Sequence, residues 1–213
     1  GAWNELGIKK RAQIFYRYHS LLLENASSLA ALIHQENGKT REEAQAEVEK
    51  AIEVTEFACA IPQFTLGENS VVSQGINCQM THEPLGVVAN ITPSNFPLMV
   101  PHWTLAICLA LGNTLILKPS EKVPLSVMHC ADLLRSAGLP DGCLEIVNGG
   151  PETVEWICDH PDIKAISFVG STKVAKIVYE RATKNHKRAL CLGGAKNYLL
   201  VLPDAHEEMT ASN

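Results

Sequence analysis

Polar residues and glycines follow several short apolar runs in the second half of the chain. "TPSNFP" carries Asn95 between two prolines, "KPSEK" carries Lys118 and Glu121, and "FVGST" carries Ser171. Cys191 precedes a pair of glycines in "RALCLGG". A thiol, an amide, a carboxylate and a hydroxyl are groups that proteins use for nucleophilic attack, for oxyanion stabilisation and for binding phosphorylated ligands.

Two of these groups suit a phosphorylated ligand, and each also has a purely structural explanation. Gly170 and Ser171 stand where a strand turns into a helix, so that free backbone N–H groups and a hydroxyl would face a phosphate. Serine is equally a preferred N-cap. Lys118 and Glu121 could contact a ribose, where the carboxylate would repel a 2′-phosphate, or could lie in a solvated loop. No G-x-G-x-x-G fingerprint occurs in the chain.

Asn95 lies in a stiff segment of the chain. Pro93 and Pro97 fix their own φ angles and bias the residues before them away from helix. A rigidly held amide is a good hydrogen-bond donor to the oxyanion of a tetrahedral intermediate. The alternative is that Asn95 caps a helix that begins near Pro97.

The cysteines indicate packing more than chemistry. They lie at positions 59, 78, 108, 130, 143, 158 and 191, without a CxxC pair or a Cys/His spacing typical of a metal site. An odd number of scattered cysteines predicts reduced intracellular thiols that fill a core. As the nucleophile of a hydrolase, Cys191 would need a histidine base, and neither the nearby His186 nor the distant His102 is placed beside it by the sequence.

The composition excludes several classes of protein. The chain has 213 residues, 46% hydrophobic and 19% charged, which is enough for one domain with a sizeable core. Its net charge of −5 and the absence of a dense Lys/Arg cluster argue against a nucleic-acid partner. The longest apolar stretch, "PLMVPHWTLAICLALG", is too short to span a bilayer, and no secretory signal precedes it. We therefore expect an intracellular protein, in the cytoplasm or the mitochondrial matrix, without a membrane partner.

The elements that must position these residues alternate between strand and helix. "GVVANITP", "TLILKP", "CLEIVNG", "KAISFVGS" and "RALCLGG" alternate with helical patterns, and "YLLVLP" follows as one more strand-like run. Nearly continuous apolar strands are typical of a parallel sheet buried on both faces. Right-handed crossovers then favour an α/β fold with a doubly wound, Rossmann-like sheet, in which ligands bind at the carboxyl ends of the strands.

The first part of the chain predicts helices. Apolar residues recur at helical spacing over 5–36, and Gly38 marks a helix stop. Thr40 and Glu43 have the spacing of a capping box at the start of a second helix, which is expected to end at "IP". Residues 66–84 mix turn residues with short alternating runs and predict an extended ribbon or edge hairpin.

The ordered set "TPSNFP", "KPSE", "FVGS" and "LGG" resembles the aldehyde dehydrogenase superfamily over the whole chain. "HPDIKAISFVGS", "GAKN" and "GLPDG" are most similar to its CoA-acylating branch, the methylmalonate-semialdehyde dehydrogenases. The resemblance implies attack of a cysteine thiolate on a small acidic semialdehyde, hydride transfer to NAD, and release of the thioester to CoA. It also implies helices of the NAD-binding domain over 1–65, a ribbon over 66–84 that bridges subunits of a homo-oligomer (dimer or tetramer), and the Rossmann-like NAD-binding domain over 85–213.

The resemblance implies a role for individual residues. Asn95 would be the oxyanion amide. The residues implied to bind the cofactor are Thr92, Ser94, Lys118, Glu121, Lys122, Gly149, Gly170, Ser171, Leu192 and Gly193. Among these, Lys118 and Glu121 would contact the adenosine ribose, Ser171 the pyrophosphate, and Gly193 would lie near the nicotinamide. No metal is implied.

The chain departs from the pattern of the superfamily at several positions. Cys191 stands where most members place the glutamate that activates water, which fits release to CoA. Ala175 replaces a glycine near the cofactor, and His82 occupies the region of an arginine attributed to substrate binding. The family's nucleophilic cysteine lies beyond "LGG", in a catalytic domain that this chain is not expected to contain. The chain alone is therefore expected to be inactive.

Two other functions are compatible with the sequence. The chain could be a nucleotide-binding or assembly module without chemistry, in which the ribbon still pairs subunits. It could also belong to a hydrolytic, non-acylating aldehyde dehydrogenase, such as a succinate-semialdehyde type.

Overall fold

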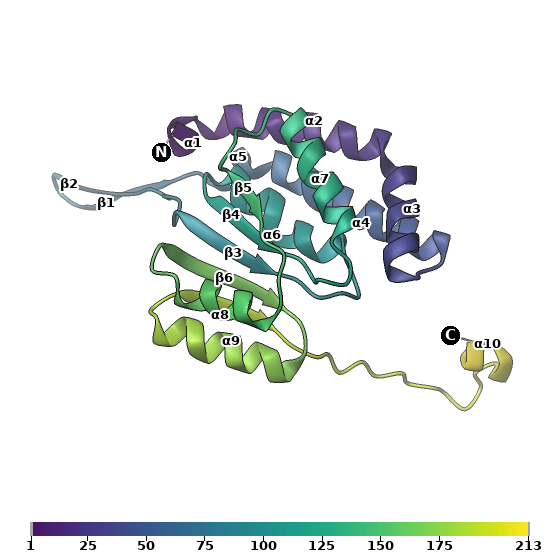
Figure 1. Ribbon diagram of the computed structural model, residues 1–213. Coiled ribbons are helices and arrows are strands. Elements are labelled where there is room, and N and C mark those ends of the chain that lie inside the picture. Colours follow the sequence, from purple (N-terminus) through teal and green to yellow (C-terminus); the bar gives the residue numbers. More distant parts are fainter. Residues whose placement is uncertain (1, 213) are drawn as a thin grey trace.

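A parallel sheet of five strands forms the centre of the computed structural model, which describes residues 2–212 (Figure 1). Its strands lie in the order β5-β4-β3-β6-β7, and every neighbouring pair is parallel. They are β3 (Val87–Ile91), β4 (Thr114–Lys118), β5 (Leu144–Ile146), β6 (Ile163–Val169) and β7 (Arg188–Leu192). The predicted α/β, doubly wound parallel sheet is therefore confirmed.

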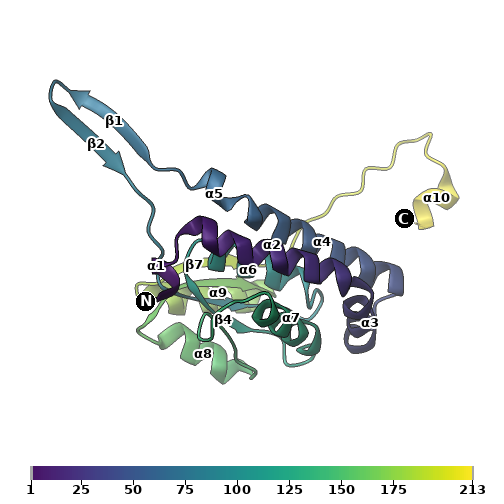
Figure 2. The same cartoon turned by 90° about the horizontal axis from the view of Figure 1, so that it is seen from above.

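Helices cover both faces of this sheet (Figures 1 and 2). The helices of the described residues are α1 (Ala2–Glu5), α2 (Ile8–Glu24), α3 (Ala26–Asn37), α4 (Arg41–Cys59), α5 (Ile61–Phe64), α6 (Met99–Ala110), α7 (Leu125–Ser136), α8 (Pro151–Asp159), α9 (Thr172–Lys184) and α10 (Glu207–Ser212), of which α10 lies away from the sheet. On one face, α6 lies against β3 and β4 and is itself packed against α2 and α4. On the other face, α8 and α9 lie over β6. Within residues 2–212, no helix has the length and apolar character needed to cross a membrane.

The central strand β3 packs on both of its faces, which explains why its sequence is apolar at successive positions. Val88 packs into the larger core cluster beneath α6, whereas Ala89 and Ile91 pack into a second cluster beneath α8 and α9. Successive side chains of a strand point to opposite faces, so a strand covered on both sides is apolar at nearly every position.

The N-terminal helices differ in part from the prediction. The single helix expected over 5–36 is divided at Asn25 into α2 and α3; the carbonyl of Leu21 accepts from the Asn25 side-chain Nδ2 at 2.8 Å and also from its backbone N–H at 3.0 Å. Gly38 ends α3 in the left-handed conformation at φ 83°, as predicted. The predicted capping box of Thr40 and Glu43 at the start of α4 is also confirmed.

The ribbon predicted over 66–84 is an antiparallel hairpin of β1 (Glu68–Ser73) and β2 (Ile76–Met80). Figure 2 shows that it projects from the body of the molecule beyond α5. Every residue of both strands is exposed. The hairpin therefore has no face buried against the rest of the described chain.

The strand-like run "YLLVLP" does not form a strand, and this prediction is wrong. After β7 the chain runs away from the sheet and ends in α10 (Figure 1). Tyr198 and Leu200 are 93% and 85% exposed. A strand is stable only when its backbone groups find partners, and no neighbouring strand is available to this run among the described residues.

A buried histidine in the larger core makes the stability of the fold depend on pH. His102 on α6 is fully buried; its Nδ1 lies 2.8 Å from the carbonyl of Leu98, and its Nε2 lies 2.8 Å from the hydroxyl of Tyr18. A carbonyl only accepts, so Nδ1 carries the hydrogen and Nε2 accepts from Tyr18. Burial lowers the pKa of His102 to about 4, which keeps the ring neutral at pH 7.

We expect the chain to lose stability as the pH falls from about 6.5 towards 4. In this range His102 binds a proton in the unfolded chain but not in the folded chain. The expected loss between pH 7 and pH 5 is roughly 2 kcal/mol of unfolding free energy. Urea unfolding at the two pH values measures it. His102→Gln should be less stable at pH 7 but should have a flatter pH profile; an equal slope in both proteins would contradict the assignment to His102.

Candidate functional site

A cavity of about 600 Å³ lies at the carboxyl ends of the central strands. From β3 the chain adds β4 and β5 on one side, and it then returns to add β6 and β7 on the other. The loops that leave β3 and β6 therefore diverge, and such a switch point is where doubly wound sheets bind ligands. The cavity is lined by residues that follow β3, β4 and β6 and by the facing sides of α8 and α9.

Most of the residues predicted to bind a cofactor line this cavity. They are Thr92, Ser94, Lys118, Glu121, Lys122, Gly170 and Ser171. Gly149, Leu192 and Gly193 do not belong to its lining, although Gly150 does. The sheet thus gathers residues that are up to 79 positions apart in the sequence, since position 171 minus position 92 is 79.

Lys118 and Glu121 form an ion pair at the rim of the cavity. The Lys118 side chain is 6% exposed and its Nζ donates to the carbonyl of Pro119 at 2.9 Å and to Glu121 Oε2 at 3.3 Å. Glu121 is 57% exposed. A hydrogen bond from its own backbone amide, followed by the hydrogen bond and charge of Lys118, holds the pKa of Glu121 below its usual value. The alternative of a solvated, unengaged loop is therefore wrong for Lys118, and Glu121 presents an ionised carboxylate.

Ser171 is the N-cap of α9, and it lines the cavity from that position. Its Oγ accepts from the backbone N–H of Val174 at 3.4 Å, so the capping role weighed from the sequence is confirmed. The first N–H groups of a helix have no intrahelical partner and carry partial positive charge. The start of α9 thus presents unpaired N–H groups of a kind that suits an anion, and it lines the same cavity as Glu121.

Asn95 lies beside the cavity, in the loop between β3 and α6, and its side chain is exposed. It is not part of the cavity lining, and within residues 2–212 its amide has no hydrogen-bond partner. The alternative that it caps a helix near Pro97 is wrong, because α6 begins at Met99 and its N-cap residue Leu98 has no capping side chain. The amide is therefore free for a ligand.

The remaining predicted glycines and Leu192 support the loops around the cavity. The carbonyl of Leu192 accepts from the N–H of Gly170 at 3.1 Å, and Gly193 lies against Thr172 at the start of α9. A Cβ at Gly149 would meet Thr153 Oγ1 at 2.0 Å, so only glycine fits there. These residues border the site; a direct contact with a ligand stays a prediction.

Several lining residues were missed from the sequence. Val154 on α8 and Val174, Ile177 and Val178 on α9 give the cavity an apolar side, here named the apolar slot, and Glu121 lines the same cavity. Val174 and Ile177 are 39% and 52% exposed, whereas Val178 is buried. Apolar residues on the outward side of a helix could have signalled this slot. The contact between α8 and α9 depends on tertiary packing and is not visible in the sequence.

Two acidic residues that cap the starts of α6 and α7, and so hold the loops before these helices, were also missed. Glu47 on α4 accepts hydrogen bonds from the backbone of Leu98 and Met99 at the start of α6. Glu36 on α3 accepts from the backbone of Leu125 and Ser126 at the start of α7. Each is a helix cap supplied by a residue distant in sequence, and no local pattern predicts such a partner.

A second cavity, of about 580 Å³, lies at the opposite end of the sheet. It is lined by the amino ends of β3 and β4, with Trp3 and Cys143 among its lining residues. The predicted polar residues are all at the other end, so we place the candidate site at the carboxyl ends. No group of His, Cys, Asp or Glu in residues 2–212 is arranged to hold a metal ion.

The sequence pattern of the aldehyde dehydrogenase family matches residues 1–213, which is the whole chain. The chain belongs to the aldehyde dehydrogenase family. Malonate-semialdehyde dehydrogenase of Lacticaseibacillus casei is 48% identical over 204 residues, covering 95% of this chain and 42% of that protein. The enzyme of the same name from Pseudomonas aeruginosa is 47% identical, covering 96% of this chain and 41% of its own. The chain thus spans less than half the length of these relatives.

Solved structures of aldehyde dehydrogenases have the same fold. A methylmalonate-semialdehyde dehydrogenase from Sinorhizobium meliloti complexed with NAD matches with a TM-score of 0.95 and 42% identity, covering 99% of this chain and 43% of that chain. An aldehyde dehydrogenase from Bacillus cereus in an NAD⁺ complex matches with a TM-score of 0.93 and 32% identity, covering 100% and 44%. The resemblance to the methylmalonate-semialdehyde branch inferred from the sequence is confirmed.

Cys191 is not arranged as a nucleophile in this member of the aldehyde dehydrogenase family. It lies half-buried in β7 and packs against the smaller core cluster, and burial raises the pKa of its thiol. His102 has both ring nitrogens engaged in the other cluster. Five other cysteines are buried, as predicted, whereas Cys78 is exposed on the hairpin.

The other two departures from the family pattern lie outside the cavity. Ala175 is 6% exposed and packs into the core beneath α9, so its methyl group points away from the ligand position. His82 is exposed in the segment that follows the hairpin. Neither residue narrows the cavity.

Proposed function

We propose that this chain is the NAD-binding part of an aldehyde dehydrogenase that oxidises a small acidic semialdehyde and passes the acyl group to CoA. The observation that carries the proposal is one cavity, at the switch point of the sheet, that gathers an ionised Glu121, a buried Lys118 and the start of α9. Family membership and the names of the relatives support the reaction class.

The residues of the cavity fit the adenosine end of NAD. Glu121 offers a carboxylate to the two ribose hydroxyls, and Lys118 offers an ammonium group beside it. The apolar slot between Val154 and Ile177 suits a flat aromatic ring such as adenine. The N-terminal amides of α9 and the Ser171 hydroxyl suit the pyrophosphate.

The other end of the site suits the reacting groups. When bound, NAD supplies a hydride acceptor. Thr92 and Ser94 line the cavity on the path from Glu121 towards Asn95, whose amide would donate to the oxygen of the aldehyde as that oxygen gains negative charge. The chain thereby provides the cofactor site and one donor for the transition state.

Release to CoA is supported by the side chain at position 191. A glutamate there would act as a base towards water, whereas the thiol of Cys191 has a raised pKa and is neutral at pH 7. Detection of an acyl-CoA product by mass spectrometry, in the complete enzyme, tests this part of the proposal. Free acid as the main product in the presence of CoA would favour the hydrolytic alternative.

The hairpin β1–β2 is proposed to bridge subunits of a homo-oligomer. All of its residues are exposed, including Val71 and Ile76 at 78% and 57%. Two exposed strands with apolar side chains and free edges are suited to pairing with another chain.

Calorimetry with the 213-residue chain tests the cofactor site. We expect NAD to bind with a dissociation constant between about 10 µM and 1 mM, which corresponds to roughly 4–7 kcal/mol. AMP should compete with NAD, because the adenosine contacts lie within this chain. A folded chain that binds neither ligand at millimolar concentration would overturn the proposed function. If the complete protein binds NAD but does not oxidise an aldehyde, the result would favour a non-catalytic nucleotide-binding module.

A further inference from the structure

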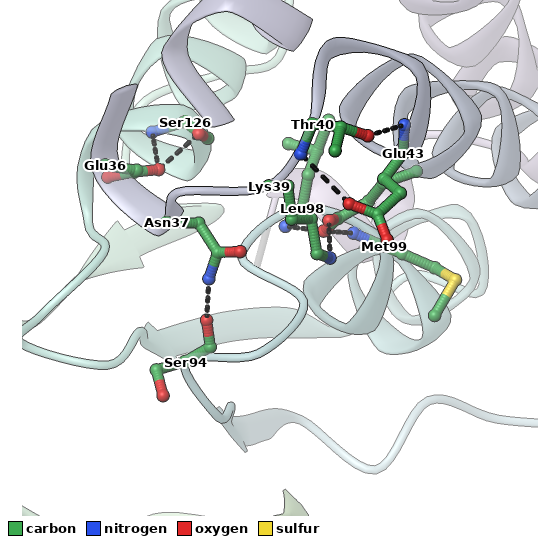
Figure 3. A network of polar contacts seen from close by, with 10 residues as sticks. Glu36, Asn37, Lys39, Thr40, Glu43, Ser94, Leu98, Met99 and Ser126 are labelled. Atoms are coloured by element: carbon green, nitrogen blue, oxygen red, sulfur yellow. Dashed lines mark hydrogen bonds and ion pairs between the residues drawn. The ribbon is translucent and has the colours of Figure 1, made fainter. Parts of the chain in front are cut away.

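The loop that carries Asn95 is held by side chains from the N-terminal helices (Figure 3). Asn37, at the end of α3, donates from Nδ2 to the carbonyl of Ser94 at 2.7 Å. Glu47 on α4 accepts from the backbone N–H of Leu98 at 2.8 Å and of Met99 at 3.1 Å. The loop is thus fixed on both sides of Asn95, by bonds that span 57 and 51 positions in the sequence.

Lys39 links these contacts. Its Nζ forms an ion pair with Glu47 Oε2 and lies 3.8 Å from the centre of the Phe96 ring. The ammonium group is thereby held between a carboxylate and an aromatic face, and both contacts are attractive for a cation. Phe96 is the residue directly after Asn95, so this contact restrains the chain on the C-terminal side of Asn95.

Glu47 places a carboxylate in a buried position, where charged residues are rarely found. Its side chain is 1% exposed, and a carboxylate removed from water is costly unless charges and hydrogen bonds satisfy it. Here three donors do so: two backbone amides at the start of α6 and the Lys39 ammonium. An apolar residue would fill the same space, but it would leave those two amides without an acceptor.

Asn95 is the residue of this loop that these contacts leave free. Thr92 at the start of the loop donates to the carbonyl of Lys118 at 3.1 Å, and the contacts above fix Ser94, Phe96 and Leu98. Only the Asn95 side chain stays exposed and without a hydrogen-bond partner in the described chain. A rigid loop around one free amide is the arrangement required of a preorganised donor.

We propose that Asn37, Lys39 and Glu47, here named the loop clamp, are positioning residues that aim the Asn95 amide at the reacting oxygen. They touch neither substrate nor cofactor and act through the loop. This inference rests on the proposed function, because it assigns the clamp to the donor for the same reaction.

A double-mutant cycle in the complete enzyme tests the clamp. Glu47→Ala is expected to lower kcat about tenfold with Asn95 present, and to lower it less than about twofold when Asn95→Ala is already in place. Glu47→Gln keeps an acceptor oxygen and should restore most of the rate. Glu53→Ala, on the same helix with a 59% exposed side chain paired to Lys50, is the matched control and should leave kcat unchanged.

The outcomes separate the two proposals. If the losses from Glu47→Ala and Asn95→Ala multiply, the clamp does not act through Asn95 and the inference is overturned. If Asn95→Ala leaves kcat unchanged, the oxyanion role in the proposed function fails, and with it the role of the clamp as an aiming device. A cycle in which the second substitution has no further effect supports both.

Amide hydrogen exchange gives a readout that does not depend on activity. In the 213-residue chain, Glu47→Ala should speed exchange of the Leu98 and Met99 amides at least about tenfold while β4 stays protected. Unchanged exchange of these two amides would overturn the clamp. If Glu47→Ala does not fold, Lys39→Met, at a side chain that is 16% exposed, replaces it in the double-mutant cycle, where it removes the ion pair and the contact with Phe96.

Discussion

Replacing Asn95 by alanine is expected to lower kcat of the complete enzyme by roughly 10²–10³, the usual effect of removing one oxyanion donor. The reason is geometric. Asn95 carries the free amide in a loop whose backbone is fixed on both sides, so the amide starts from a defined place in the loop when charge develops. Steady-state rates at saturating NAD and aldehyde measure the effect.

The same variant provides its own control. Because Asn95 lies outside the lining of the cavity, the dissociation constant for NAD should stay within about threefold of the original, a change of less than about 0.7 kcal/mol. The loss cannot come from a missing helix cap, since Glu47 caps α6. An unchanged kcat would mean that Asn95 is only a loop residue.

Glu121→Gln is expected to change the preference between NAD and NADP by roughly 10². The ionised carboxylate would accept two ribose hydroxyls of NAD, and an amide accepts them less well because hydrogen bonds to charged groups are stronger. The same carboxylate would repel the 2′-phosphate of NADP, and Gln removes that repulsion. We therefore expect about tenfold weaker binding of NAD and about tenfold tighter binding of NADP.

Calorimetric titration of the 213-residue chain with each nucleotide measures both constants. Glu49→Gln, an exposed residue on α4 that contacts Gln45, makes the same chemical change away from the cavity and should alter neither. If the ratio of the two constants does not move in Glu121→Gln, the ribose contact is assigned to the wrong residue. Repulsion between exposed charges is screened, so the gain in NADP binding should shrink at high salt.

The strands and their ends were predictable because they depend on nearby residues. Each strand of the sheet is buried on both faces and therefore appears as a continuous apolar run, and the residue that follows the run lies at the carboxyl end of the strand. Lys118 and Ser171 were placed correctly for this reason. The capping box of Thr40 and Glu43 was also predictable, since both partners lie within one helical turn.

One error was local: apolar spacing alone gave one helix over 5–36, although the chain divides into α2 and α3 at Asn25. The other errors came from segments whose state depends on distant partners. The run at 198–203 has the composition of a strand, but a strand needs a neighbour, and in the described chain it has none. Asn95 was weighed as a helix cap because prolines and an amide precede α6, whereas the cap comes from Glu47.

The sequence by itself determined the α/β fold, the order in which strands and polar loops follow one another, and the family to which the chain belongs. These depend on periodicity and on short motifs, which local backbone preferences and burial impose. Only the tertiary structure decided that α8 and α9 add an apolar slot to the cavity that Glu121 lines, and that Glu47 holds the loop of Asn95. The physical reason is that a buried carboxylate is stable only where folding brings donors to it, and two of its three donors, the amides of Leu98 and Met99, lie 51 and 52 positions away.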